Sequence, residues 1–107
     1  MERGQRRSSS SCPNCESHLR PDVVLFGEDL PDGAISKTEE AIDRCDIFIT
    51  VGTSGLVYPA ADLPFYARKA GAFTIEINTE PTPFSNYASC FLRGKSGEIL
   101  PQILQAL

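Results

Sequence analysis

Short apolar runs alternate with amphipathic stretches along most of this chain. The longest run, Ile47–Val51, is rich in β-branched residues, which is typical of a strand that is covered on both faces of a parallel sheet. Shorter apolar runs at residues 23–26, 73–77 and 90–92 are bounded by proline, glycine or polar residues, and each predicts a further strand. The pattern therefore predicts three or four strands.

Three stretches between and after these strands carry apolar residues at helical spacing. Residues 34–45 form an amphipathic pattern with Asp32 as the expected N-cap. A second helix is expected over residues 64–70, because Pro64 suits a first helical turn and Gly71 is a typical helix stop. A last helix is expected after Ser96 as its cap. Its apolar stripe consists of Ile99, Leu100, Ile103, Leu104 and Leu107.

The predicted element order is βαβαβ(β)α. Strands that are joined by helices indicate a parallel sheet with helices on both faces, which is the doubly wound α/β class. Ligands of such sheets bind outside the carboxyl ends of the strands. The loops that follow Val51 and Ile77 are therefore the first places to look for a site.

Length and charge narrow the range of functions. The chain has 107 residues, enough for one domain, and a net charge of −4, so we expect no nucleic-acid partner. No apolar run approaches the length of a membrane span, and we expect a soluble intracellular protein, cytoplasmic, with a mitochondrial location as the alternative. Residues 1–11 are rich in arginine and serine and are expected to form a disordered tail.

Polar residues follow two of the predicted strands. Gly52, Thr53 and Ser54 come directly after the buried run, and the two hydroxyl groups are suited to phosphate or ribose. Asn78 and Glu80 follow the next strand, and both side chains can bind ribose hydroxyls. Taken alone, each loop is read more readily as an ordinary turn, and no glycine-rich nucleotide motif is present.

Cys12 and Cys15 form a Cys-x-x-Cys pair, which is half of a tetrahedral zinc site. A redox pair and an inert remnant are the alternatives, although a redox pair would open a helix after a strand. Cys45 and Cys90 are expected to be small buried apolar residues. The only histidine, His18, is interpreted as a solvated loop residue rather than a ligand.

Together these motifs resemble the sirtuin family of NAD-dependent protein-lysine deacylases, in its bacterial and mitochondrial branch. The resemblance covers residues 12–107 and depends on five stretches in matching order. They are Cys-x-x-Cys at 12–15, residues 19–28, residues 51–54 with 57–60, residues 77–82 and residues 93–98. It implies a partial Rossmann-like sheet that forms the carboxyl-terminal half of a sirtuin domain, with half a zinc site.

The resemblance also implies roles for particular residues. The NAD pocket would be lined by Gly52, Thr53, Ser54, Asn78, Glu80 and Ser96. An acyl-lysine substrate peptide would be bound between two segments, one with Val24, Phe26, Gly27 and Glu28 and the other with Val57 and Tyr58. Cys12 and Cys15 would match the second zinc pair of the family.

Three family features have no counterpart in these 107 residues. They are the GAGxS segment that opens the NAD site, the histidine segment that supplies the general base, and the first zinc pair. We therefore expect no catalytic residue here and no deacylase activity from these residues alone. The missing half would supply further strands of the sheet. Without them, the strand that they pair with would become an exposed edge that is prone to association. A non-catalytic nucleotide- or peptide-binding module and a small zinc or thiol protein are the alternatives.

Overall fold

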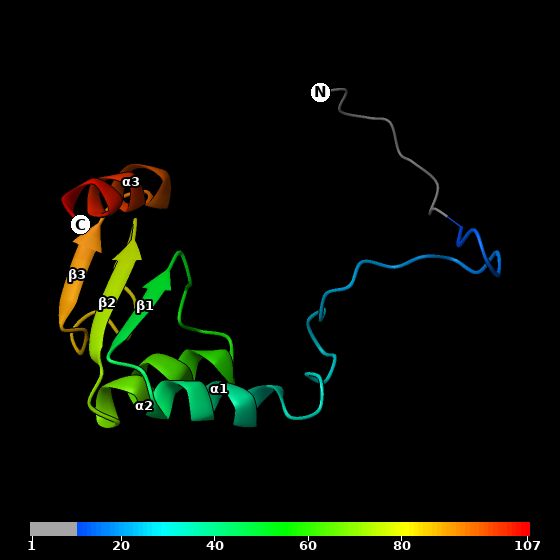
Figure 1. The fold of residues 1–107 in the computed structure, drawn as a ribbon, viewed down its shortest axis with the longest axis horizontal. Helices are drawn as coiled ribbons and strands as arrows, with labels where there is room; N and C mark the ends of the chain where they lie inside the picture. The colour runs from blue at the N-terminus through cyan, green and yellow to red at the C-terminus, as the bar shows by residue number, and fades with distance from the viewer. Residues whose placement is uncertain (1–10) are drawn as a thin grey trace. The chain divides into compact units, whose positions relative to one another are not determined.

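The computed structural model describes residues 11–107. The chain divides after Pro31 into two units, Met1–Pro31 and Asp32–Leu107, and each is described by itself. Residues 1–10, which make up nearly all of the expected tail, lie outside the described part. Figure 1 traces the chain from its amino terminus to the helix at its carboxyl terminus.

The described part of the first unit, residues 11–31, contains turns and an isolated antiparallel bridge between Ser11 and His18. The strand predicted at residues 23–26 is wrong. The chain turns there instead, because the Glu28 amide donates to the Leu25 carbonyl at 3.0 Å and Gly27 has a positive φ of 87°. The apolar run is short, and in the described residues no strand pairs with it.

The second unit contains a parallel sheet and its helices. In chain order the elements are α1 (Ala34–Asp43), β1 (Ile47–Val51), the 3-10 helix η1 (Ala60–Asp62), α2 (Leu63–Lys69), β2 (Phe73–Asn78), β3 (Cys90–Arg93) and α3 (Ser96–Ala106). The strands lie in the order β1-β2-β3 and all run parallel, with Ile47 opposite Phe73 and Ile75 opposite Cys90. The predicted parallel α/β fold is confirmed for this unit.

Helices cover both sides of this sheet. Helix α2 packs on β1 and β2 and α1 packs on α2. Their contact forms a core of Ile42, Ala67 and Ala72, against which Phe48 packs. Helix α3 contacts β2 and lies on the other side of the sheet from α1 and α2 (Figure 1). Ile77 of β2 is fully buried, so β2 is the best covered strand.

One face of β1 is open, contrary to the expectation that this strand is covered on both faces. Thr50 is buried on the helix side, but Ile47, Ile49 and Val51 on the other face are 57%, 48% and 38% exposed. In the described residues, no strand pairs with the outer edge of β1. The apolar character of this face is therefore unexplained by residues 11–107 alone.

Helix ends differ from the expected caps. Gly33 in the left-handed region, not Asp32, is the N-cap of α1, and Lys95, not Ser96, is the N-cap of α3. The apolar stripe of α3 is only half covered, since Ile99 and Ile103 are half-buried whereas Leu104 is 73% exposed. Across residues 11–107, no helix has the length and apolar content needed to cross a bilayer.

Candidate functional site

Two neighbouring cavities lie where the parallel strands end. The first, about 270 Å³, is lined by Gly52, Ile77, Asn78, Thr79, Gly94, Lys95 and Ser96. The second, about 380 Å³, is lined by Gly52, Ser54, Leu56, Asn78, Thr79, Glu80, Pro81 and Thr82. Both cavities share Gly52, Asn78 and Thr79. This is the edge at which parallel α/β sheets bind ligands, and it unites the predicted residues that follow β1 with those that follow β2.

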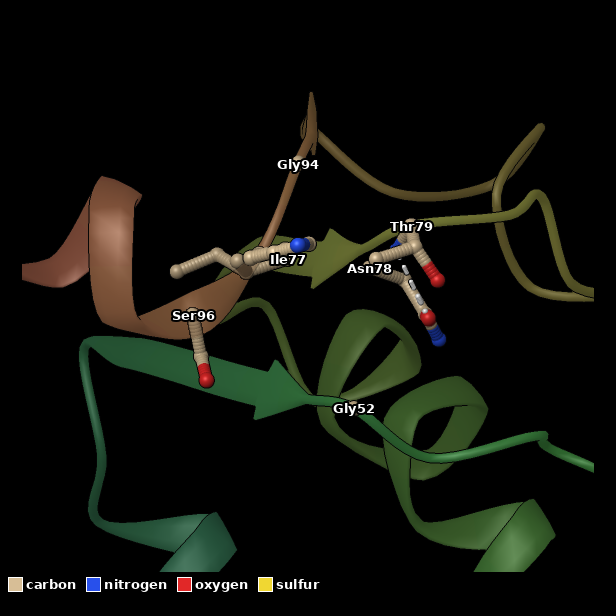
Figure 2. Close-up of a pocket in the computed structure, with 7 residues that line it drawn as sticks. Gly52, Ile77, Asn78, Thr79, Gly94 and Ser96 are labelled. Carbon is tan, nitrogen blue, oxygen red and sulfur yellow. Dashed lines mark hydrogen bonds between the residues drawn. The ribbon is translucent and has the colours of Figure 1, made fainter.

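Asn78 joins the ends of the first two strands. Its Nδ2 donates to the Thr53 carbonyl at 2.7 Å, and its Oδ1 accepts the Thr79 amide at 2.9 Å. Figure 2 shows the side chain of Asn78 pointing toward the end of β1, where Gly52 lies, and that of Ser96 pointing toward β1 itself. The Asn78 amide group keeps one further N–H and one lone pair for a ligand. Asn78 therefore lines the cavity and also holds the two strand ends that form its wall.

Glycines bring backbone close to this site. The Gly52 amide donates to the Ile77 carbonyl and the Gly94 amide to the Asn78 carbonyl, both at 2.9 Å. Gly52 has φ 67° and Gly94 has φ 155°, conformations that side chains disfavour. A Cβ atom at Gly94 would also lie 2.7 Å from the Cδ1 atom of Ile99. A side chain would therefore strain the backbone at both positions and would collide with Ile99 at Gly94.

The hydroxyl groups after β1 are partly occupied. Thr53 Oγ1 accepts the Gly55 amide at 3.4 Å, and Ser54 Oγ accepts the Leu56 amide at 3.3 Å. Ser54 lines the second cavity. Thr53 lines neither cavity, and its carbonyl accepts the hydrogen bond of the Asn78 amide. Each hydroxyl still holds its own proton for donation to a ligand.

Glu80 is the most available anion of the site. Its side chain is 76% exposed, and its ion pair with Arg93 is long, at 3.4 Å. Arg93 Nε also donates to the Thr79 carbonyl at 3.2 Å. An exposed pair of this kind contributes little to stability. The carboxylate is consequently free to accept hydrogen bonds from a ligand hydroxyl.

Several lining residues were missed by the sequence reasoning. Thr79, Gly94 and Lys95 line the first cavity, and Lys95 brings a cation to it. Gly94 and Lys95 could have been found from the sequence, because they follow the strand predicted at residues 90–92. That strand, β3, also runs parallel, so the residues that follow it reach the same edge of the sheet as the residues after β1 and β2.

The two predicted peptide-binding segments lie in different units. In the first, Phe26 is 90% exposed and Val24 43% exposed. In the second unit, Val57 and Tyr58 are 48% and 68% exposed. Both segments thus offer apolar side chains to solvent.

Glu28 holds the turn of the first segment. Its carboxylate accepts Arg20 Nη2 at 2.7 Å and the Leu25 amide at 3.0 Å. These two bonds, that of Arg20 first, lower the pKa of Glu28. Gly27, with its positive φ, completes the turn.

Cys12 and Cys15 face each other across a closed turn. The Cys12 amide donates to the Ser17 carbonyl at 2.8 Å and the Glu16 amide to the Cys12 carbonyl at 2.9 Å. Hydrogen bonds from Ser17, and then from the Cys12 side chain, lower the pKa of the Cys15 thiol. Within residues 11–107 no cluster of three or more metal-binding side chains exists.

The other expectations on cysteine and histidine are met only in part. Cys45 and Cys90 are half-buried rather than buried, with Cys45 packed against the apolar core. His18 is exposed and takes part in the bridge to Ser11.

The fold is a parallel α/β sheet with a cavity at the edge where such sheets bind ligands, and comparison with known proteins identifies the family. The model of the Sir2 family matches residues 1–59. An NAD-dependent protein deacylase of Pyrococcus furiosus is 45% identical over 96 residues, which are 90% of this chain and 38% of that protein.

Solved structures agree with this match. The crystal structure of a Sir2 homologue–NAD complex superposes with a TM-score of 0.80 at 39% identity and covers 92% of this chain and 39% of the other. A structure described as Sir2–p53 peptide–NAD+ gives a TM-score of 0.77 at 31% identity, covering 92% and 41%. The chain belongs to the Sir2 family, the sirtuins. It spans about two fifths of the length of the relatives it matches.

Proposed function

We propose that this chain is the part of an NAD-dependent protein-lysine deacylase that binds the dinucleotide and one side of the acyl-lysine substrate. The observation that carries the proposal is the pair of adjoining cavities at the ends of three parallel strands. The NAD complex of a 39% identical relative supports it.

The cavity residues offer suitable chemistry for a dinucleotide. Glu80 accepts hydrogen bonds from ribose hydroxyls, and Asn78 supports that ribose with its remaining N–H. Ser96 and the backbone beside it border the adenine, while Gly52, Thr53 and Ser54 approach the rest of the nucleotide from the end of β1. Lys95, at the rim of the first cavity, offsets the negative charge of the diphosphate.

The substrate is an acyl-lysine segment of another protein. We assign its contacts to Val24, Phe26, Gly27 and Glu28 in one segment and to Val57 and Tyr58 in the other. Main-chain hydrogen bonds to an extended peptide explain how many sequences can be accepted. The Sir2–p53 peptide structure of a 31% identical relative supports a peptide ligand.

Zinc is the second group that the family implies. The facing thiols of Cys12 and Cys15 would supply two thiolates, and a tetrahedral structural site needs two more ligands. Bound zinc would supply folding stability to the turn rather than chemistry. If two chains supplied their cysteine pairs to one ion, the result would be a metal-dependent dimer.

Catalysis requires a general base that these 107 residues do not provide at the cavities. Their only histidine is His18, which lies in the first unit and pairs with Ser11. We propose that the 107 residues alone bind ligand without deacylating it, and that the isolated chain self-associates through the open edge of β1. A deacylase assay of the isolated chain that showed turnover would contradict the first statement.

Calorimetry with ADP-ribose tests the nucleotide site. Glu80→Gln removes the charge at nearly constant shape and is expected to weaken binding about tenfold, in line with the loss of a charge-assisted hydrogen bond. Glu40→Gln is the matched control, because Glu40 is also exposed but lies on α1, away from both cavities. Equal affinities for the two variants would exclude Glu80 from the site.

A further inference from the structure

A buried carboxylate lies beneath the nucleotide site without lining it. Glu76 of β2 is 1% exposed. Its Oε2 accepts the hydroxyl of Thr82 at 2.5 Å, and its Oε1 accepts the hydroxyl of Ser85. A carboxylate that is removed from water is costly unless its oxygen atoms are satisfied by hydrogen bonds. The two hydroxyl groups provide this satisfaction.

The proton positions in this cluster follow from the neighbouring amides. The Phe84 amide donates to Thr82 Oγ1 at 3.2 Å, and the Thr82 amide donates to Ser85 Oγ at 2.7 Å. Each hydroxyl oxygen is therefore already an acceptor, which leaves its own proton for Glu76. Both oxygen atoms of Glu76 must act as acceptors, a pattern that a carboxylate satisfies and an amide does not.

This cluster closes the loop that carries the expected ribose-binding residues. Glu76 precedes Asn78 by two residues on β2, and Thr82 follows Glu80 by two residues. The carboxylate thus joins the strand to the far end of the segment 77–81. The Ser85 amide, which donates to the Thr82 carbonyl at 3.0 Å, closes a compact turn next to it.

We propose that Glu76 is a positioning residue for nucleotide binding. It holds Thr82 and Ser85 so that Thr79 and Glu80 stay at the cavity wall, although Glu76 itself lines neither cavity. This inference rests on the proposed binding of NAD at that wall. It predicts that the buried carboxylate acts on ligand affinity through the loop, beyond its effect on stability.

Glu76→Gln is the sharpest perturbation of this cluster. The substitution keeps the shape of the side chain but places an N–H donor opposite a hydroxyl proton, so that one of the two bonds is lost. Thr74→Val is the matched control. Thr74 is also buried on β2 and bonds a loop residue, since its Oγ1 accepts the Ser89 amide at 2.9 Å, but neither Thr74 nor Ser89 lines a cavity.

Three measurements on the 107-residue chain and its variants decide the proposal. They are thermal unfolding, amide hydrogen exchange over residues 79–85 without ligand, and ADP-ribose affinity by calorimetry. For Glu76→Gln we expect faster exchange, by about tenfold, confined to this loop, and about tenfold weaker affinity. For Thr74→Val we expect a comparable fall in Tm with an affinity within about twofold of the parent.

Two results would overturn the role of Glu76. Unchanged loop exchange in Glu76→Gln overturns the proposal, as does an affinity loss that Thr74→Val reproduces at equal Tm. If Glu76→Gln does not fold, Ser85→Ala removes one of the two bonds and the same comparison is made. If the parent chain binds no ADP-ribose, the proposed function fails, and the role of Glu76 in nucleotide binding fails with it. Amide hydrogen exchange without ligand then shows whether Glu76 still holds the loop through Thr82 and Ser85.

Discussion

The open face of β1 gives a quantitative test of the fold. Ile77 and Ile49 lie on neighbouring strands and on the same side of the sheet, but Ile77 is 0% exposed and Ile49 is 48% exposed. A fully buried isoleucine that is truncated to alanine costs about 3 kcal/mol of the free energy of unfolding, from lost burial and the cavity that remains. Ile49 loses about half of that burial and leaves no closed cavity, so about 1 kcal/mol is expected.

Urea unfolding followed by far-UV circular dichroism measures both values, because the chain has no tryptophan to report by fluorescence. The expected difference between Ile77→Ala and Ile49→Ala is about 2 kcal/mol with an unchanged m-value. If Ile49→Ala proved as costly as Ile77→Ala, the β1 face would be covered in solution. A cost that rises with protein concentration would identify a second copy as the cover.

Two further predictions concern pH. The bonds of Glu28 to Arg20 and the Leu25 amide lower its pKa, so they stabilise the turn above the ordinary carboxyl pKa and are lost as the pH falls through the lowered value. NMR titration of the Leu25 amide should report that midpoint, and Arg20→Gln should raise it; an unmoved midpoint would contradict the assignment. The hydrogen bond of Tyr66 to Asp43, at 2.8 Å, raises the pKa of the phenol. The contribution of this phenol to stability is present below its ordinary pKa and is lost as the pH rises through the raised value. Ultraviolet titration should show a tyrosine midpoint that Asp43→Asn lowers, and a titration curve that Asp43→Asn leaves unchanged would refute the assignment to Tyr66.

Hydrophobic patterning predicted most of the second unit because its elements form from local sequence. The β-branched run at Ile47–Val51 and the helical spacing after Gly33 both appear where expected. The strand at residues 23–26 failed because strand formation needs a partner, and a four-residue apolar run can equally accompany a turn held by Glu28. The open face of β1 was not foreseen because the apolar pattern of a strand does not show which elements pack against each of its faces.

The site was predictable in its location but not in its internal bonds. The topology of parallel strands places Gly52 and Asn78 at one edge of the sheet, and the structure confirms that they share both cavities. No sequence pattern indicates that the Asn78 amide binds the Thr53 carbonyl. Nor does a pattern indicate that Glu76 is satisfied by hydroxyl groups six and nine residues away. Such contacts depend on how a loop closes in three dimensions.

Amide chemical-shift mapping during an NAD titration tests the central claim most directly. We predict shifts concentrated at the wall shared by the two cavities and at the end of β3. The affected residues should be Gly52, Asn78, Thr79, Gly94 and Ser96, which line the first cavity, while the amides of α1 remain still. The absence of shifts at saturating NAD, or shifts confined to residues 11–31, would contradict the assignment of the nucleotide site.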